Sequence, residues 1–166
     1  MYLMFIQYMK ISRKYLPKNL TRKDRNKQYK ELVKSRKLYK KGIYHARPKL
    51  KSFKSKKSRH IIKAEKMYGV NKIGPTRELA KASGCSKSAL KKIINKGEGA
   101  YYSSGSRPNQ TAQSWGIARL ASAITAGNAA LIDYHILEKG CKPNSKALTL
   151  AKRLKKTKNK TKRRSS

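Results

Sequence analysis

Few side chains in this sequence could perform catalysis, and they lie far apart along the chain. The seven acidic residues are Asp24, Glu31, Glu65, Glu78, Glu98, Asp133 and Glu138. Their spacing gives no pair of carboxylates that could hold a catalytic metal ion, and no serine stands in a nucleophile elbow. We therefore expect no enzymatic activity, no cofactor and no small-molecule substrate.

The histidines and cysteines are also scattered. No CxxC or HxxxH spacing occurs among His45, His60, His135, Cys85 and Cys141, so the sequence predicts no zinc site. One disulfide is arithmetically possible, but two cysteines do not indicate a secreted, disulfide-rich scaffold. Free thiols in a reducing compartment are the favoured interpretation.

Most of the ionisable side chains in the sequence are cationic. Lysine and arginine total 44, and the formal net charge is +37, whereas small soluble domains usually carry a net charge of about 2 to 8. Such a chain repels itself unless a polyanion lies beside it. Nucleic acid is the commonest partner of this kind, and an acidic protein surface or an anionic membrane leaflet are the alternatives.

The charge is unevenly distributed. Residues 21–70 carry +16 and residues 146–166 carry +10, whereas residues 101–145 carry only +2. The nearly neutral segment is where a core can form, and the flanking segments are where an anion can bind. The candidate polyanion-binding residues are Lys54, Lys56, Lys57, Arg59, Lys87, Lys91, Lys92, Arg107, Arg163 and Arg164.

The first part of the chain is predicted to form arms and helices. Residues 1–20 begin with nine almost wholly apolar residues, an arm that could dock in a partner's groove or add to a sheet. Insertion at a membrane surface, helped by Lys10, is a second interpretation. Within 21–73, Thr21 caps a helix through Tyr39, residues 43–58 form an extended strap that is disordered without a partner, and a short helix covers 59–68.

Residues 74–95 have the spacing of a helix-turn-helix. Ala80 is small where the helices would cross, Gly84 suits the positive φ of the turn, and Leu90 and Ile93 follow at core positions. A purely structural helix pair is favoured over sequence-specific DNA recognition. The lysines of the second helix suit phosphate better than base edges.

Residues 97–111 are rich in glycine, serine and asparagine, and an irregular loop is expected. One hypothesis is a phosphate-cradling loop that uses backbone amides and Arg107. The favoured one is a structural loop that joins the helix pair to the next helix through Arg107, Tyr101 and Trp115.

Two apolar helices follow, one starting at Thr111 or Ser114 and one over 128–137, with small residues that allow antiparallel packing. Trp115 is expected to anchor a core that includes Leu90, Ile93 and Leu120. A last helix over 146–156 should give way to a disordered basic tail. The fold class is therefore mainly α: a small helical core within 74–145, flanked by basic extensions at 1–20, 21–73 and 146–166.

The run from Gly97 to Leu137 resembles a family of uncharacterised proteins from nucleocytoplasmic large DNA viruses and some tailed phages. The matching features are Gly-x-Gly-Ala-Tyr, Ser-Ser-Gly-Ser-Arg-Pro-Asn-Gln-Thr, Ser114-Trp115 and Ala118-Arg119-Leu120. Upstream segments at 15–21, 34–37 and 51–58 are similar too, so the likeness covers most of residues 15–141. The family carries no catalytic assignment that could be transferred here.

The resemblance implies a structural protein of the virion. Our first hypothesis is a minor capsid protein that bridges capsomers on the inner face of a large icosahedral shell, after synthesis in the host cytoplasm or nucleus. Its partners would be other capsid proteins, chiefly the major capsid protein, with viral DNA or an internal membrane surface as further contacts. The alternative is a basic protein that condenses the genome. A ribosomal protein would share the composition, but the viral resemblance disfavours it.

Overall fold

The structure is a computed structural model that describes residues 10–164, and these are mainly helical, as the sequence predicts. They divide into two compact units that alternate along the chain. The N-terminal unit consists of residues 10–55 together with Tyr102–Thr111. The C-terminal unit consists of Lys56–Tyr101 and residues 112–164. The apolar arm expected at residues 1–9 lies outside the described residues.

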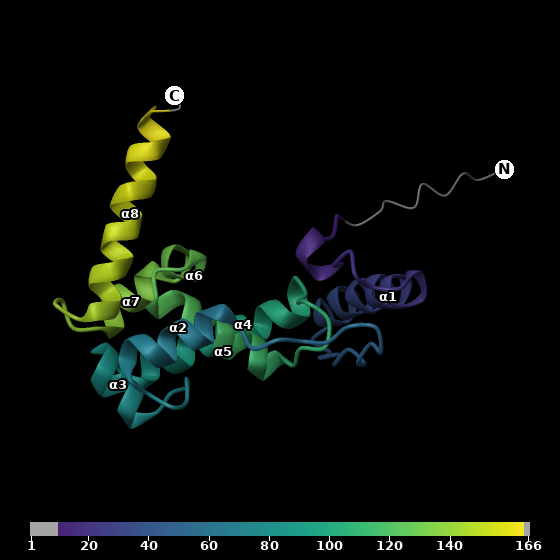
Figure 1. Cartoon of the computed structure of the whole chain (residues 1–166), viewed down its shortest axis with the longest axis horizontal. Coiled ribbons are helices and arrows are strands. Elements are labelled where there is room, and N and C mark those ends of the chain that lie inside the picture. The colour runs from purple at the N-terminus through teal and green to yellow at the C-terminus, as the bar shows by residue number, and fades with distance from the viewer. Residues whose placement is uncertain (1–9, 165–166) are drawn as a thin grey trace. The chain divides into compact units, whose positions relative to one another are not determined.

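The N-terminal unit contains the 3-10 helix η1 (Arg13–Tyr15) and helix α1 (Arg22–Tyr39), both drawn in purple in Figure 1. The hydroxyl of Thr21 accepts a hydrogen bond from the amide of Asp24 and caps α1. The predicted start and end of this helix are confirmed. The capping residues are local, which is why sequence alone located them.

The strap at 43–58 contains no helix or strand, as expected, but it is attached to the N-terminal unit at Leu50. Leu50 is only 4% exposed, and Leu32 of α1 is fully buried. A Cβ atom on Gly105 would lie 2.7 Å from Leu32 Cδ2. The expectation that the strap is disordered without a partner is therefore wrong for the part around Leu50. Leu32 and Leu50 meet Gly105 and Asn109, which follow 59 or more positions later and lie outside any local window of sequence.

The C-terminal unit is a helical cluster arranged around α5. Its helices are α2 (Arg59–Tyr68), α3 (Arg77–Ser83), α4 (Lys87–Ser103), α5 (Ala112–Ile124), α6 (Asn128–Ile132), α7 (Tyr134–Gly140) and α8 (Lys146–Arg164). The last two residues of α4 belong to the N-terminal unit. Helix α5 packs against α2, α6 and α8, because one side of it consists of small and aliphatic residues that are fully buried.

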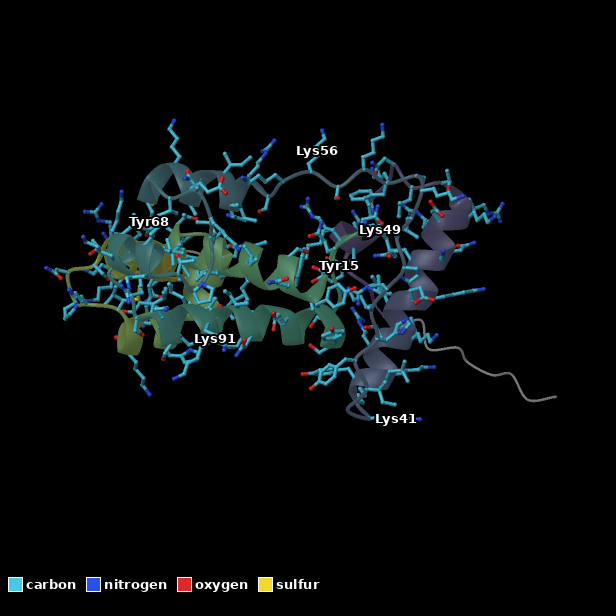
Figure 2. All side chains as sticks on the ribbon, turned by 90° about the horizontal axis from the view of Figure 1, so that it is seen from below. Tyr15, Lys41, Lys49, Lys56, Tyr68 and Lys91 are labelled. Atoms are coloured by element: carbon cyan, nitrogen blue, oxygen red, sulfur yellow. A yellow bond between two sulfur atoms is a disulfide. The ribbon has the colours of Figure 1, made fainter. Side chains whose placement is uncertain are left out.

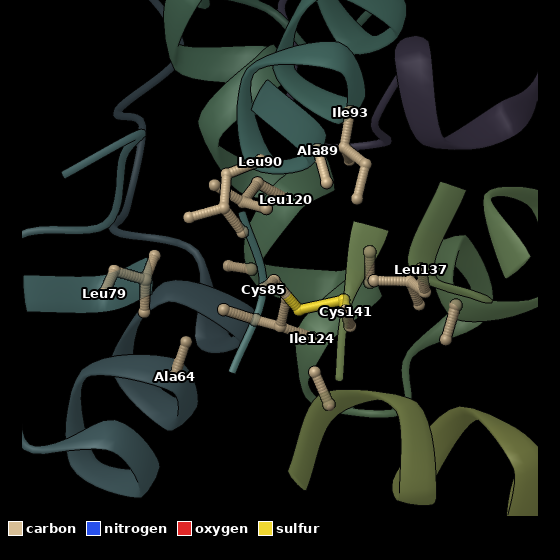
Figure 3. Packing of buried hydrophobic residues seen from close by; sticks show 14 of the residues in the cluster. Ala64, Leu79, Cys85, Ala89, Leu90, Ile93, Leu120, Ile124, Leu137 and Cys141 are labelled. Carbon is tan, nitrogen blue, oxygen red and sulfur yellow. A yellow bond between two sulfur atoms is a disulfide. The ribbon is translucent and has the colours of Figure 1, made fainter. Parts of the chain in front are cut away.

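The core of this unit includes Leu90, Ile93 and Leu120, all fully buried (Figure 3). Trp115, expected as the anchor, is only partly buried. The phenol of Tyr68 is instead buried, and its hydroxyl donates a hydrogen bond to the carbonyl of Ile124. Burial raises the pKa of this phenol.

Helix α4 extends through Ser103, so the expectation of an irregular segment from Gly97 is wrong for its first seven residues. A Cβ atom on Gly97 would lie 2.5 Å from the Cα atom of Gly116. Glycine at this position therefore lets α4 and α5 approach closely. The glycines of residues 97–111 predict an irregular loop, because sequence alone does not distinguish a glycine that breaks a helix from one that lets two helices touch.

Two other helices differ from their predicted bounds. The helix expected over 128–137 is divided at Asp133 into α6 and α7. Helix α8 continues to Arg164, beyond the end expected near Lys156. Lysine and arginine have good helix propensity, whereas the prediction of a disordered tail rested on their mutual repulsion.

Cys85 and Cys141 form a disulfide, shown in yellow in Figure 3, so the expectation of free thiols is wrong. Their backbones pair as an isolated antiparallel bridge between the α3–α4 turn and the segment after α7. The two cysteines are 56 positions apart in sequence. Nothing local in the sequence indicates that these two backbones meet.

Candidate polyanion-binding surfaces

Helix α4 presents lysines on the side opposite its buried face. Lys87, Lys91 and Lys92 are all exposed, while Ala89, Leu90, Ile93 and Ile94 are buried. The 3.6-residue helical period separates the two sets, because the buried residues recur every three or four positions. The three predicted anion-binding lysines of this helix therefore lie together on one solvent-facing surface.

The turn before α4 has helix-turn-helix geometry and is firmly supported. Gly84 has a φ of +73° and ends α3. The amide of Ser86 donates to the carbonyl of Gly140 at 2.8 Å, and the amide of Lys142 donates to the carbonyl of Gly84 at 2.8 Å. The disulfide lies beside these bonds. The lysines of α4 are thus mounted on a fixed scaffold, which suits phosphate contacts that set position.

The other predicted cations lie on other elements. Lys56 and Arg59 are exposed at the start of the C-terminal unit, and Lys56 extends away from the ribbon in Figure 2. Lys57 forms an ion pair with Glu65 at 2.6 Å. Lys54 is exposed in the N-terminal unit. The structure therefore distributes the predicted residues over several elements of both units.

Sequence reasoning missed a basic face of α1. Lys30, Lys34, Lys37 and Lys41 surround a shallow groove of about 430 Å³, and Tyr29, Val33 and Leu38 line its apolar part. The four lysines follow one another at intervals of three or four residues, which is the spacing of a single helical face. That spacing is a sequence signal that could have found this surface.

Helix α8 is the most basic element. Its side chains from Lys155 to Thr161 are all exposed, and the C-terminal half of the helix extends beyond α6 and α7 in Figure 1. Arg163 and Arg164 lie in its last turn. No acidic residue occurs in this helix. Its cations therefore have no counter-charge within the element that carries them.

The loop at 104–111 uses its polar groups to hold the N-terminal unit together. Arg36 donates to the carbonyl of Ser104 through Nε at 2.9 Å and Nη2 at 2.6 Å. Arg47 donates to the hydroxyl of Ser106 at 2.7 Å. The side chain of Gln28 donates to the carbonyls of Tyr15 and Ser106. These bonds favour the structural hypothesis for this loop.

Asn109 fixes the strap to the same loop. Its Oδ1 accepts from the amide of Leu50 at 2.7 Å, and its Nδ2 donates to the carbonyls of Leu50 and Phe53 at 3.1 and 2.6 Å. Arg107, between the buried Ser106 and Pro108, is exposed. The loop therefore binds α1 and the strap.

Asp24 provides a second attachment for the strap. Its Oδ2 accepts hydrogen bonds from the hydroxyl of Ser52 at 2.6 Å and from its amide at 2.9 Å. These bonds lower the pKa of the Asp24 carboxyl, and the positive charges of Lys27 and Lys23 act in the same direction. One of the few carboxylates of the chain thus holds the strap against the start of α1.

A buried ion cluster in the C-terminal unit was also missed by sequence reasoning. The carboxylate of Asp133 is fully buried, and Arg119 binds both of its oxygens at 2.7 and 2.8 Å. Lys96 of α4 lies 3.1 Å from the same carboxylate. Opposite charges at 119 and 133, inside the least charged segment, are the sequence signal for this pair.

Three tyrosines of the N-terminal unit form an aromatic cluster. The rings of Tyr39 and Tyr102 stack at 6.3 Å, and the ring of Tyr44 meets Tyr102 edge-on at 5.1 Å. Tyr44 is 68% exposed. The ring of Tyr39 also meets that of Tyr44 at 5.9 Å, so the three rings pack on one another within the N-terminal unit.

Within residues 10–164, no three histidine, cysteine or carboxylate side chains gather in a way that could hold a metal ion. No helix in that part of the chain has both the length and the apolar character needed to cross a membrane. The fold and these surfaces define a helical protein with several exposed basic faces.

Residues 12–139 match the model of a family that is described as a family of unknown function (DUF5824), and the chain belongs to this family. Helix α8 lies outside the matched residues. Comparison with curated proteins and with solved structures gave no match.

Proposed function

We propose that this chain is a non-catalytic structural protein that bridges polyanionic surfaces, and that it serves as a minor capsid component on the inner face of a large icosahedral DNA virus. The observation that carries the proposal is the net charge of +37. Seven carboxylates can neutralise only a small part of the 44 cations. Most of the cations therefore depend on a partner for their counter-charge.

The distribution of these cations favours bridging over binding at one point. Helix α1 carries one lysine face, α4 carries another, and α8 is basic along its exposed half. The first belongs to the N-terminal unit and the other two to the C-terminal unit. A protein with separate cationic faces can contact more than one acidic surface. Capsomers, chiefly of the major capsid protein, are the partners that the viral resemblance suggests.

The packing of both units supports a structural role. Asn109 and Asp24 hold the strap with side-chain hydrogen bonds, and the disulfide and the Asp133 cluster hold the C-terminal unit. In each unit the chemically distinctive residues thus maintain the fold, and the exposed residues are mainly cations. Such a molecule fits assembly inside the virion better than turnover of a substrate.

The test is a binding assay with purified capsomers. We expect the wild-type chain to bind them, and binding to weaken as salt rises because exposed charge pairs are screened. We expect a variant with glutamine at the four lysines of the α1 face to bind capsomers more weakly than a variant with glutamine at four lysines of α8. The α1 variant replaces Lys30, Lys34, Lys37 and Lys41. Fractionation of the particle should place the protein with the shell. A chain that fails to bind capsomers and sediments with the genome would overturn the capsid proposal.

The lysine face of α4 favours a second candidate function, condensation of the viral genome. Its three lysines project from a helix-turn-helix-like pair, a form that can enter the major groove of DNA. Binding would then rest on phosphate neutralisation, so the logarithm of the affinity should fall by about 0.9 per phosphate contact for each tenfold rise in salt. A DNA affinity that does not change with salt would remove this candidate.

A further inference from the structure

The distal half of α8 is exposed, and Lys155 contacts the rest of the C-terminal unit through the ring of Tyr134, with its Nζ 4.0 Å from the ring centroid. Near its start, Ala147, Leu148 and Ala151 are buried and Leu154 is partly buried. From Lys155 to Thr161 every side chain is exposed. The helix is therefore attached to the C-terminal unit at its base, while its distal half presents its side chains to solvent.

The spacing of the cations on this half matches that of phosphates on duplex nucleic acid. Six lysines and arginines occur within nine residues: Lys152, Arg153, Lys155, Lys156, Lys158 and Lys160. With a rise of 1.5 Å per residue, the helix carries about one positive charge per 2 Å of its axis. Duplex DNA carries about one negative charge per 1.7 Å of its axis. The two charge densities are nearly equal.

The charges also surround most of the helix. At 100° per residue, the cations leave a single narrow uncharged stripe, formed by Leu154, Thr157 and Thr161. A helix that lies on a membrane needs a broad apolar face, which this stripe does not provide. A helix between two phosphate backbones needs cations on both sides. Its diameter of about 10 to 12 Å fits a major groove about 12 Å wide.

The same charges oppose the helix when it is alone. Lys152, Lys156 and Lys160 follow one another at intervals of four residues, and like charges at this spacing repel. The side chains from Lys155 to Thr161 are exposed, so little burial offsets the repulsion there. Binding of a dense polyanion removes it, so helix formation and binding should be coupled.

We propose that α8, from Lys152 to Lys160, binds duplex nucleic acid in the major groove and that the duplex stabilises its helix. The proposal rests on the polyanion-binding part of the proposed function and names the partner of one surface. The contacts are with phosphates, so binding is independent of base sequence. In a minor capsid protein, this helix would connect the inner face of the shell to the packaged genome.

The test uses two variants of Thr157 in the full-length chain, because this residue lies in the exposed half and carries no charge. Thr157→Pro breaks the helix and leaves every cation in place. Thr157→Ala keeps the helix and serves as the matched control. Affinity is measured for a short DNA duplex, for a single strand of the same length, for heparin and for anionic vesicles, and helix content is measured by circular dichroism with and without each ligand.

We expect the wild type and Thr157→Ala to gain helix content on binding the duplex and to bind it alike. Thr157→Pro should bind the duplex at least about tenfold more weakly than the wild type, because entry into the major groove requires an intact helix. It should bind heparin about as well as the wild type, because heparin has no groove and binds through charge alone. Equal duplex affinity of the two variants, or an equal gain of helix content with heparin, single strands or vesicles, would overturn the major-groove proposal. A chain that binds neither heparin nor any nucleic acid near physiological salt would instead overturn the polyanion-binding function itself.

Discussion

Replacing Asp133 with asparagine tests whether the buried ion cluster stabilises the C-terminal unit. The substitution keeps the size of the side chain and removes its charge, so the guanidinium of Arg119 loses its counter-ion. Breaking a buried ion pair in this way usually costs about 3 to 5 kcal/mol. Asp133 is fully buried, but the Arg119 side chain is 19% exposed and can recover part of its hydration. We therefore expect a loss near the lower limit, about 3 kcal/mol.

The assay is urea unfolding, followed by the fluorescence of Trp115, the single tryptophan of the chain. With a slope of about 1 to 3 kcal/mol per molar urea, this loss should lower the midpoint by about 1 to 3 M. Lys96→Gln is the control, since the Lys96 side chain is 42% exposed and its pair should contribute less than about 1 kcal/mol. If Asp133→Asn were no more destabilising than Lys96→Gln, the reasoning on the buried cluster would be refuted.

Three further predictions concern the close helix contact, the disulfide and the strap. Gly116→Ala should destabilise the C-terminal unit by about 1 to 3 kcal/mol in the same urea assay, because the new Cβ would lie 2.6 Å from a backbone carbonyl oxygen of α4; an unchanged midpoint would contradict that contact. Reduction of the disulfide, or Cys85→Ser with Cys141→Ser, should cost up to about 4 kcal/mol for a loop of this length, and a wild-type midpoint that is insensitive to reductant would argue against the bond. The hydrogen bonds from Ser52 lower the pKa of Asp24 in the folded state. The stability that they contribute is fully present when the pH is above the unfolded-state pKa, and it is lost as the pH falls through the lower folded-state pKa. A carboxyl titration followed by nuclear magnetic resonance should therefore give a pKa below 3.8, which Ser52→Ala raises, and an ordinary value in the wild type would contradict the assignment.

Local signals in the sequence located most helix starts. The side chains of Thr21, Ser58 and Thr76 each accept a hydrogen bond from the backbone at the first turn of a helix. These caps depend on neighbours within three residues, so they can be recognised without knowledge of the fold. The mainly helical class followed from the same signals.

The contacts that stabilise each unit internally could not be predicted from such local signals. Gln28 meets Ser106 across 78 positions, and Cys85 meets Cys141 across 56. Glycines posed a related difficulty, because Gly97 was interpreted as a helix breaker although it lies inside α4. A sequence shows which residues are small or polar, whereas the partner that requires this property comes from a distant part of the chain.

The candidate binding surfaces were predictable in kind but not in arrangement. An excess of cations follows from composition alone, and it indicates a polyanionic partner. The grouping of lysines on α4 requires knowledge of its buried face. The basic face of α1 could have been derived from the spacing of its lysines at intervals of three or four residues.

The alternation of the two units along the chain constrains how the protein is made. The N-terminal unit is completed by Tyr102–Thr111, so α1 must wait during translation until that segment has left the ribosome. Until then its apolar side chains, including Leu32, remain uncovered in a strongly cationic nascent chain. Dividing the chain between residues 55 and 56 would leave the first product without Tyr102–Thr111 and so without a whole N-terminal unit, whereas a fragment of residues 10–111 would contain all the described pieces of that unit.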